Sequence, residues 1–187
     1  QTGLNMNLAP VVDVNVNPLS PAIGALDRSF SADPDSVALH ASWFIDEFRS
    51  RGIITTLKHF PGHGSATGDS HDGFTDVTTS WSPVELVPYE RLLAACTVDA
   101  VMTAHLYNGT LDNVFPATLS WPTITGLLRH QLGFQGVVVT DEMSMKAIST
   151  LCAMDEAVER ALDAGVDVLL YNRNLDSTGS SLARRIV

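Results

Sequence analysis

The segment Ile53-Ile-Thr-Thr-Leu-Lys-His-Phe-Pro-Gly-His-Gly-Ser-Ala-Thr-Gly-Asp-Ser-His71 combines a strand signal with a cluster of titratable side chains. Its first five residues are apolar or β-branched, which is typical of a buried strand. The run ends on Lys58 and His59, and the proline and glycines that follow predict a long, permissive loop. The loop carries three more titratable residues, His63, Asp69 and His71. Because loops seldom concentrate such groups, the segment predicts the edge of an active site.

The composition bounds the class of protein. The chain has 187 residues, of which 45% are hydrophobic, and this suits one domain with a sizeable core. Its net charge is −10 and it has no basic block, so we expect no nucleic-acid partner. No apolar run approaches the ~20 residues of a membrane span. Cys96 and Cys152 fit neither a disulfide framework nor a cysteine-based zinc site.

Strand and helix signals alternate along the chain. Residues 5–16 predict a strand that bends at Pro10. The sequence Asp33-Pro34-Asp35 predicts a helix start, and the helix should end near Gly52. The sequence Ser82-Pro-Val-Glu85 predicts a capping box and a second helix to about residue 97. Further strands are predicted at 99–107, 136–142 and 166–171, and further helices at 123–131 and 153–164.

This alternation repeats about five times and therefore predicts a parallel α/β fold. Three consecutive valines at 137–139 indicate a strand buried on both faces. In such folds ligands bind at the C-terminal ends of the strands. Polar residues occupy several predicted ends: Asp13, Lys58, His59, His105, Asp141 and Asn172. Their repetition favours a barrel over a Rossmann sheet, and the chain has neither G-x-G-x-x-G after its first strand nor a P-loop.

The residue types allow several kinds of chemistry. Asp141 could act as a nucleophile or general base, or it could simply cap the next turn. Asp69 and His71 are close enough for the carboxylate to orient the imidazole, which could then act as acid and base; the alternative is a solvated loop with incidental charges. Lys58 and His59 could bind anionic or hydroxyl groups, and Lys58 could instead form a Schiff base.

Two further features of the N-terminal half are ambiguous. Arg28 is the only lysine or arginine among the first 48 residues, and a lone loop arginine can equally be a surface charge. The three histidines and the aspartate within 59–71 suggest a metal site, but their spacing departs from H-E-x-x-H and the stretch is a loop rather than a helix. We therefore expect no metal site and no cofactor.

Taken together, these segments resemble family 3 glycoside hydrolases, and more narrowly the β-N-acetylglucosaminidase branch. The signature loop is Lys58-His-Phe-Pro-Gly-His-Gly64, followed by Asp69-Ser-His71. Three other segments match the family in the same order: Asn7–Val14, Arg28–Pro34 and Thr140–Met145. The resemblance implies a (β/α)₈ TIM-barrel type of catalytic domain, retention of anomeric configuration and no required metal.

The resemblance also implies roles for individual residues. Asp141 would be the nucleophile that forms the glycosyl-enzyme. His71, backed by Asp69, would replace the usual carboxylic acid/base. Asp13 and His105 match less specific segments and are weaker candidates. Three residues match family positions that hydrogen-bond sugar hydroxyls: Arg28, Lys58 and His59.

A barrel of this type needs ~250 residues. We therefore expect residues 1–187 to be a single catalytic-domain segment, an incomplete barrel that lacks N-terminal strands and the last strand. The expected substrate is a carbohydrate that contains N-acetylglucosamine, such as an oligosaccharide or a cell-wall fragment. A β-glucosidase, a glycoside phosphorylase of the same family and an inactive sugar-binding fragment are the alternatives, and the Asp-x-His loop favours the hexosaminidase branch.

Overall fold

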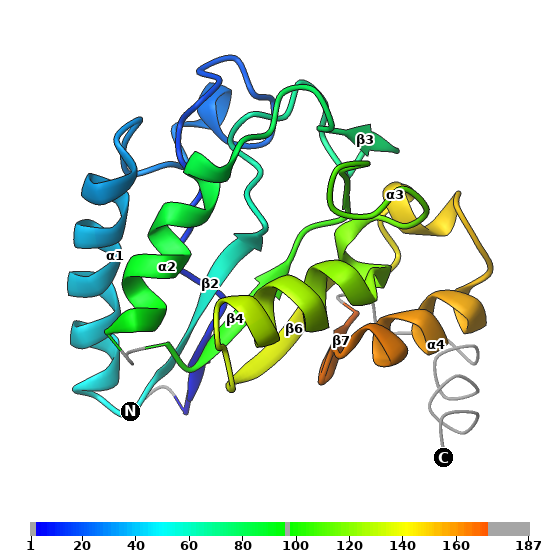
Figure 1. Ribbon diagram of the computed structural model, residues 1–187. Coiled ribbons are helices and arrows are strands. Elements are labelled where there is room, and N and C mark those ends of the chain that lie inside the picture. Colours follow the sequence, from blue (N-terminus) through cyan, green and yellow to red (C-terminus); the bar gives the residue numbers. More distant parts are fainter. Residues whose placement is uncertain (1–2, 96–97, 172–187) are drawn as a thin grey trace.

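The computed structural model describes residues 3–95 and 98–171, in which short strands alternate with helices (Figure 1). Cys96, Asn172 and the helix expected after residue 177 lie outside these ranges. The strands are β1 (Met6–Asn7), β2 (Ile54–Phe60), β3 (Thr75–Asp76), β4 (Ala100–Thr103), β5 (Leu106–Tyr107), β6 (Val137–Glu142) and β7 (Val168–Leu170). The helices are η1 (Gly24–Leu26), α1 (Pro34–Arg49), η2 (Pro83–Leu86), α2 (Val87–Ala94), η3 (Ala117–Leu119), the π-helix η4 (Pro122–Gln131), α3 (Lys146–Ser149) and α4 (Met154–Ala164).

Five of the described strands form one sheet in the order β1-β2-β4-β6-β7, and all of its pairings are parallel. Each new strand is added at the same edge, so the sheet never reverses direction. The helices between the strands lie along one face of the sheet (Figure 1). This winding is that of a TIM-type barrel, of which the described strands form a part, and it confirms the predicted fold class.

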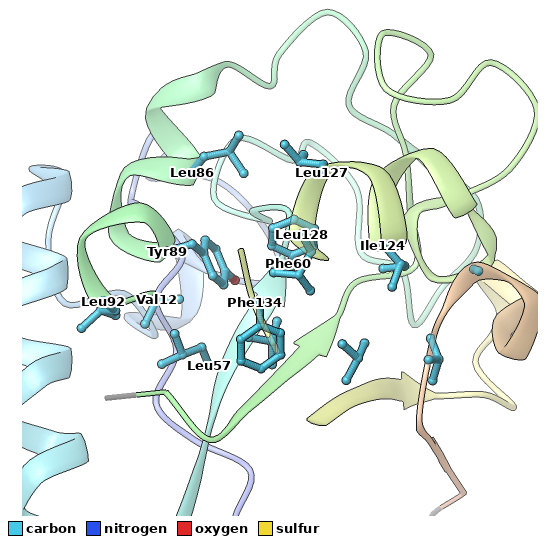
Figure 2. Packing of buried hydrophobic residues seen from close by; sticks show 14 of the residues in the cluster. Val12, Leu57, Phe60, Leu86, Tyr89, Leu92, Ile124, Leu127, Leu128 and Phe134 are labelled. Carbon is cyan, nitrogen blue, oxygen red and sulfur yellow. The ribbon is translucent and has the colours of Figure 1, made fainter. Parts of the chain in front are cut away.

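The core lies between the strands and this helical layer. Leu57, Val101 and Val138 project from three neighbouring strands and are fully buried. Phe60 from β2 meets Tyr89 from α2 edge to face, with ring centroids 5.1 Å apart (Figure 2). The opposite face of the sheet is also apolar and borders a groove of about 450 Å³. An apolar surface on both faces agrees with the valine-rich pattern of β6.

Helix α1 begins and ends as its sequence predicts. The Asp33 carboxylate accepts a hydrogen bond from the Ser36 N–H at 3.0 Å, and Pro34 occupies the first turn. Beyond the last turn, Gly52 adopts a positive φ of 70°. The capping box predicted at Ser82 is wrong, because Ser82 makes no side-chain cap and Glu85 points into the protein. The segment forms the short helix η2, which continues directly into α2.

Three strand predictions also need correction. The strand expected over 5–16 is only two residues long, and an isolated bridge from Val11 to Lys58 follows after the bend at Pro10. Strand β2 does not stop at Leu57 but continues to Phe60. The strand expected over 99–107 is split, because β5 leaves the main sheet and pairs with β3.

The buried face of α1 provides a test of the core. Ile45 is fully buried, whereas Leu39 on the same helix is half exposed. We expect Ile45→Ala to lower the free energy of unfolding by about 2–5 kcal/mol, because a cavity replaces packed methyl groups. Leu39→Ala is the matched control and should change it by less than about 0.5 kcal/mol. Urea denaturation of the two variants measures the difference, and equal losses would contradict this packing.

Candidate active site

The candidate site lies at the C-terminal edge of the sheet, where the loops that follow the strands converge (Figure 1). Asp13 follows β1, the Gly-rich loop follows β2, and His105 follows β4. Asp141 is the second-to-last residue of β6. The structure thus brings the predicted strand-end residues of its described part to one edge, as the parallel topology requires.

The carboxylate of Asp13 organises the first part of this edge. It is fully buried and accepts hydrogen bonds from the His59 Nδ1–H at 2.7 Å and the His63 N–H at 2.7 Å. The His59 N–H lies 3.2 Å from both of its oxygens. Burial alone would raise the pKa of Asp13, but the charge and hydrogen bonds of His59 and His63 hold it below its usual value. Asp13 therefore serves as an ionised anchor within the protein.

His59, held by Asp13, in turn positions Arg28. Its Nδ1–H is donated to Asp13, so Nε2 is free to accept, and Arg28 Nη2 lies 3.3 Å away. The other terminal nitrogen of Arg28 donates to the Ala22 carbonyl at 2.7 Å. Both terminal nitrogens of Arg28 are thus fixed, which is unlike a free surface charge. The predicted sugar-binding residues Arg28 and His59 lie side by side.

Lys58, the third predicted sugar-binding residue, is half-buried beside them. Burial and the positive charge of Arg28 lower the pKa of Lys58, while Asp141 and Asp13 oppose this, and the net effect is a pKa below the usual value. Lys58 is thus within electrostatic reach of the loop that holds Arg28 and of the end of β6. Arg28, Lys58 and Asp141, from three separate chain segments, therefore lie near one another.

The Gly-rich loop is anchored at its base. The Trp81 indole N–H donates to the Pro61 carbonyl at 3.1 Å, and the Asn17 N–H donates to the Gly64 carbonyl at 3.0 Å. Glu85 Oε2 accepts from the Gly64 N–H at 2.8 Å and the Ser65 N–H at 3.3 Å. The sequence suggests a wholly permissive loop, but hydrogen bonds from several directions fix its first part.

Asp69 and His71 lie at the outer part of this loop and form a pair. Asp69 Oδ1 accepts from the His71 N–H at 2.9 Å and from the His71 Nδ1–H at 2.7 Å. Burial would raise the pKa of Asp69, but these two bonds and the His71 charge lower it below its usual value. The His71 side chain is 61% exposed, against 22% for Asp69. With Nδ1 bonded, Nε2 is the ring atom that can exchange a proton with a bound molecule.

The outer part of the loop is tied to the segments that follow β4 and β6. The Ala147 N–H, shortly after Asp141, donates to the Ser70 carbonyl at 3.3 Å. Strand β3, which ends the loop, pairs with β5 through Thr75 and Leu106. The loop that holds His71 therefore meets the chain that holds Asp141.

His105 joins β4 to β6 beneath the site. It is fully buried, its Nε2–H donates to the Glu142 carbonyl at 3.0 Å, and its Nδ1 lies 2.8 Å from Thr118 Oγ1. Burial lowers the pKa of His105, and the nearby Asp141 only partly opposes this. The His71 charge also lowers it, so Asp141 and His71 both lie within electrostatic reach of this ring. Both ring nitrogens of His105 are thus engaged within the protein.

Asp141 is half-buried at the end of β6, and its Oδ1 accepts a hydrogen bond from the Glu142 N–H at 2.8 Å. A strand end is rigid, which suits a carboxylate that must meet a reacting carbon.

The residue that sequence reasoning missed is Glu85. It lies 21 residues from Gly64, and a capping pattern cannot distinguish a glutamate that faces its own helix from one that faces a distant loop.

Two negative findings concern the described ranges 3–95 and 98–171. No three histidine, cysteine, aspartate or glutamate side chains there are grouped so that they could hold a metal ion. No helix in these ranges has the length and apolar character needed to cross a membrane.

The fold and the site together define a class. A barrel-type α/β protein with a carboxylate at a strand end, and an imidazole–carboxylate pair on the adjoining loop, has the arrangement of an acid/base enzyme. Comparison with known proteins narrows the class. Residues 1–184 match the family described as "Glycosyl hydrolase family 3 N terminal domain". The chain belongs to this family, as its motifs predict.

Similar proteins carry hexosaminidase names. Beta-hexosaminidase A of Pseudoalteromonas piscicida is 38% identical over 182 residues, which cover 90% of this chain and 30% of that protein. The β-N-acetylglucosaminidase from Paenibacillus sp. str. FPU-7 has 41% identity and a TM-score of 0.85, over 91% of this chain and 33% of that one. The β-N-acetylhexosaminidase from Beutenbergia cavernae DSM 12333 has 32% identity and a TM-score of 0.90, over 97% and 55%. The chain thus spans about a third to a half of the length of these proteins.

Gly64 provides a test of the anchored loop. A Cβ atom at this position would lie 1.7 Å from the Val14 carbonyl oxygen, so the loop would have to move. We expect Gly64→Ala to lower the free energy of unfolding by about 1–3 kcal/mol or more. Gly126→Ala in η4 is the control, because its added Cβ would meet nothing closer than 3.8 Å. Thermal unfolding of both variants compares them, and a harmless Gly64→Ala would show that the loop is not held as described.

Proposed function

We propose that the protein that contains this chain is a retaining glycoside hydrolase that removes terminal β-linked N-acetylglucosamine through a covalent glycosyl-enzyme. The observation that carries this proposal is the 2.7 Å pair of Asp69 and His71, on a loop tied to the segment that follows Asp141. Retention requires a nucleophile on one face of the sugar and an acid/base on the leaving-group side. The hexosaminidase names of the relatives support N-acetylglucosamine as the sugar.

In the first step the Asp141 carboxylate attacks the anomeric carbon, and the bond from that carbon to the leaving oxygen breaks. His71 Nε2–H gives its proton to the departing oxygen. In the second step the neutral His71 takes a proton from water, which attacks the anomeric carbon and releases Asp141. Asp69 holds Nδ1–H throughout and stabilises the imidazolium of the first step.

The choice of imidazole has a physical reason. In the second step the Asp141 carboxylate re-forms as the leaving group, and a neutral histidine base does not repel it, whereas a second carboxylate would. In this proposal Arg28, Lys58 and His59 hydrogen-bond sugar hydroxyls, and the electrostatic interaction of Lys58 with Asp141 supports their place near the nucleophile. The order of His59 and Arg28 derives from Asp13, so the sugar would meet groups that are already oriented.

Asp141→Asn tests the proposed nucleophile. The amide cannot form the ester intermediate, so turnover of an aryl N-acetyl-β-glucosaminide should fall by at least about 10³-fold while sugar binding persists. A slow fluorinated N-acetylglucosaminide should label Asp141 covalently, as mass spectrometry would show. A label on Glu142 or Asp69 would overturn the assignment. Parallel assays with plain aryl glucosides, and with phosphate as acceptor, separate the hydrolase from a β-glucosidase or a phosphorylase.

His71→Ala tests the proposed acid/base. A nitrophenol leaves without a proton, whereas a sugar hydroxyl does not. The variant should therefore lose about 10²–10⁴-fold more activity on oligosaccharides than on nitrophenyl glycosides, the usual range of a general-acid contribution. Steady-state rates on both substrates measure the gap. His40→Ala is a control, because His40 lies on the exposed side of α1 and should leave both rates unchanged. Equal losses in His71→Ala would mean that His71 only positions the sugar.

A further inference from the structure

A second buried carboxyl lies under the Gly-rich loop and has no part in the chemistry described above. Glu85 is fully buried in η2, and its Oε2 accepts from the Gly64 N–H and the Ser65 N–H. A Cβ atom at Gly62 would lie 2.5 Å from Glu85 Cβ, so the glutamate side chain packs directly against the bare backbone there. The loop and this carboxyl are therefore fitted to each other.

Asp13 accepts hydrogen bonds from other backbone amides of the same loop. It takes the N–H groups of His59 and His63, while Glu85 takes the next two in the chain. Backbone amides over residues 59–65 thus converge on two buried carboxyls. The side chain of His63 continues outward, since its Nε2 lies 3.3 Å from Ser70 Oγ, between Asp69 and His71. His63 thereby connects the base of the loop to the Asp69–His71 pair at its outer part.

Holding a carboxyl at this place is costly. Burial raises the pKa of Glu85 to about 7 even though hydrogen bonds from Ser65 and Gly64 act in the opposite direction, and the charge of Asp13 raises it further. A buried apolar side chain would avoid this cost but would leave two loop amides without an acceptor. The arrangement makes sense where the position of the loop matters more than the stability of the core.

We propose that Glu85 is a positioning residue for the proposed reaction: by accepting the amides of Gly64 and Ser65 it fixes the loop base, and through it the place of the Asp69–His71 pair. The kinetic part of this proposal rests on the proposed function, because it takes His71 as the proton donor. The anchoring part rests only on the contacts of Glu85.

Two substitutions of Glu85 test whether the loop is held by the hydrogen-bond acceptor of this side chain. Glu85→Ala removes the acceptor, whereas Glu85→Gln retains an amide oxygen that can accept both N–H groups. Misplacing a catalytic group by about 1 Å costs on the order of 10²-fold, so Glu85→Ala should lose about that much kcat on oligosaccharides. On nitrophenyl glycosides it should lose less than about threefold, and Glu85→Gln should stay within about threefold on both. If Glu85→Ala does not fold, Glu85→Asp, whose carboxyl is withdrawn by one methylene, takes its place.

A double-mutant cycle tests whether Glu85 acts through His71. In the full protein carrying His71→Ala, the further change Glu85→Ala should cause no additional loss that depends on the leaving group. Additive losses in the cycle would overturn the proposal. Leu92→Ala on α2 is the control for general destabilisation, because Leu92 is buried in the core. If Leu92→Ala produced the same substrate-dependent loss, the proposal would also fall.

Hydrogen exchange followed by mass spectrometry separates this proposal from the proposed function. Peptides covering 61–75 should exchange faster in Glu85→Ala than in the native protein, and at the native rate in Glu85→Gln. Unchanged exchange in Glu85→Ala would overturn the anchoring whatever the kinetics show. If the exchange behaves as expected but His71→Ala loses activity equally on all substrates, the anchoring stands and the proposed acid/base is wrong.

Discussion

The hydrogen bonds that converge on the Asp13 carboxylate are the interaction on which the rest of the site depends. They connect the chain that follows β1 to the end of β2, and they orient His59 so that it can accept from Arg28. A buried carboxylate is tolerated only when hydrogen bonds and nearby positive charge compensate its lost hydration. His59 and His63 supply the hydrogen bonds, Lys58 lies within electrostatic reach of Asp13, and the backbone there is held as a consequence. The order of the loop and of the His59 and Arg28 side chains thus has a common origin.

The loop after β2 combines two mechanical properties. Its base over 61–66 is buried and bonded on several sides, while Asp69 and His71 farther along are partly exposed. The proposed proton donor must reach a leaving group that changes from one substrate to the next, yet it must return to one place relative to the proposed nucleophile. A fixed base with an accessible outer part satisfies both needs, and the bond from the Ala147 N–H to the Ser70 carbonyl ties the outer part of the loop to the segment that follows Asp141.

Much of the fold could be predicted because it rests on local signals. The valine run of β6, the cap at Asp33 and the alternation of elements each depend on neighbouring residues, and the structure agrees with all three. The errors occur where distant contacts decide. Strand β5 pairs with β3 rather than continuing β4, and Glu85 turns inward because Gly64 and Ser65 need an acceptor. A sequence pattern has no access to partners that lie 20 or more residues away.

The same limit applies to the site, because residue type alone does not distinguish a residue that holds the structure from one that could act on a substrate. His59, His63 and His105 are buried and engaged with protein groups, whereas His71 is exposed. The carboxyls divide in a similar way, because Asp13 and Glu85 are fully buried and Asp141 is not.

A group whose hydrogen bonds are all used within the protein is poorly placed to attack or protonate a substrate, since it would first have to abandon those bonds. Burial therefore assigns the buried members of each set to support, and leaves His71 and Asp141 as the groups that could protonate or attack a substrate. The supporting residues are still needed, because His71 would otherwise have no fixed position relative to Asp141.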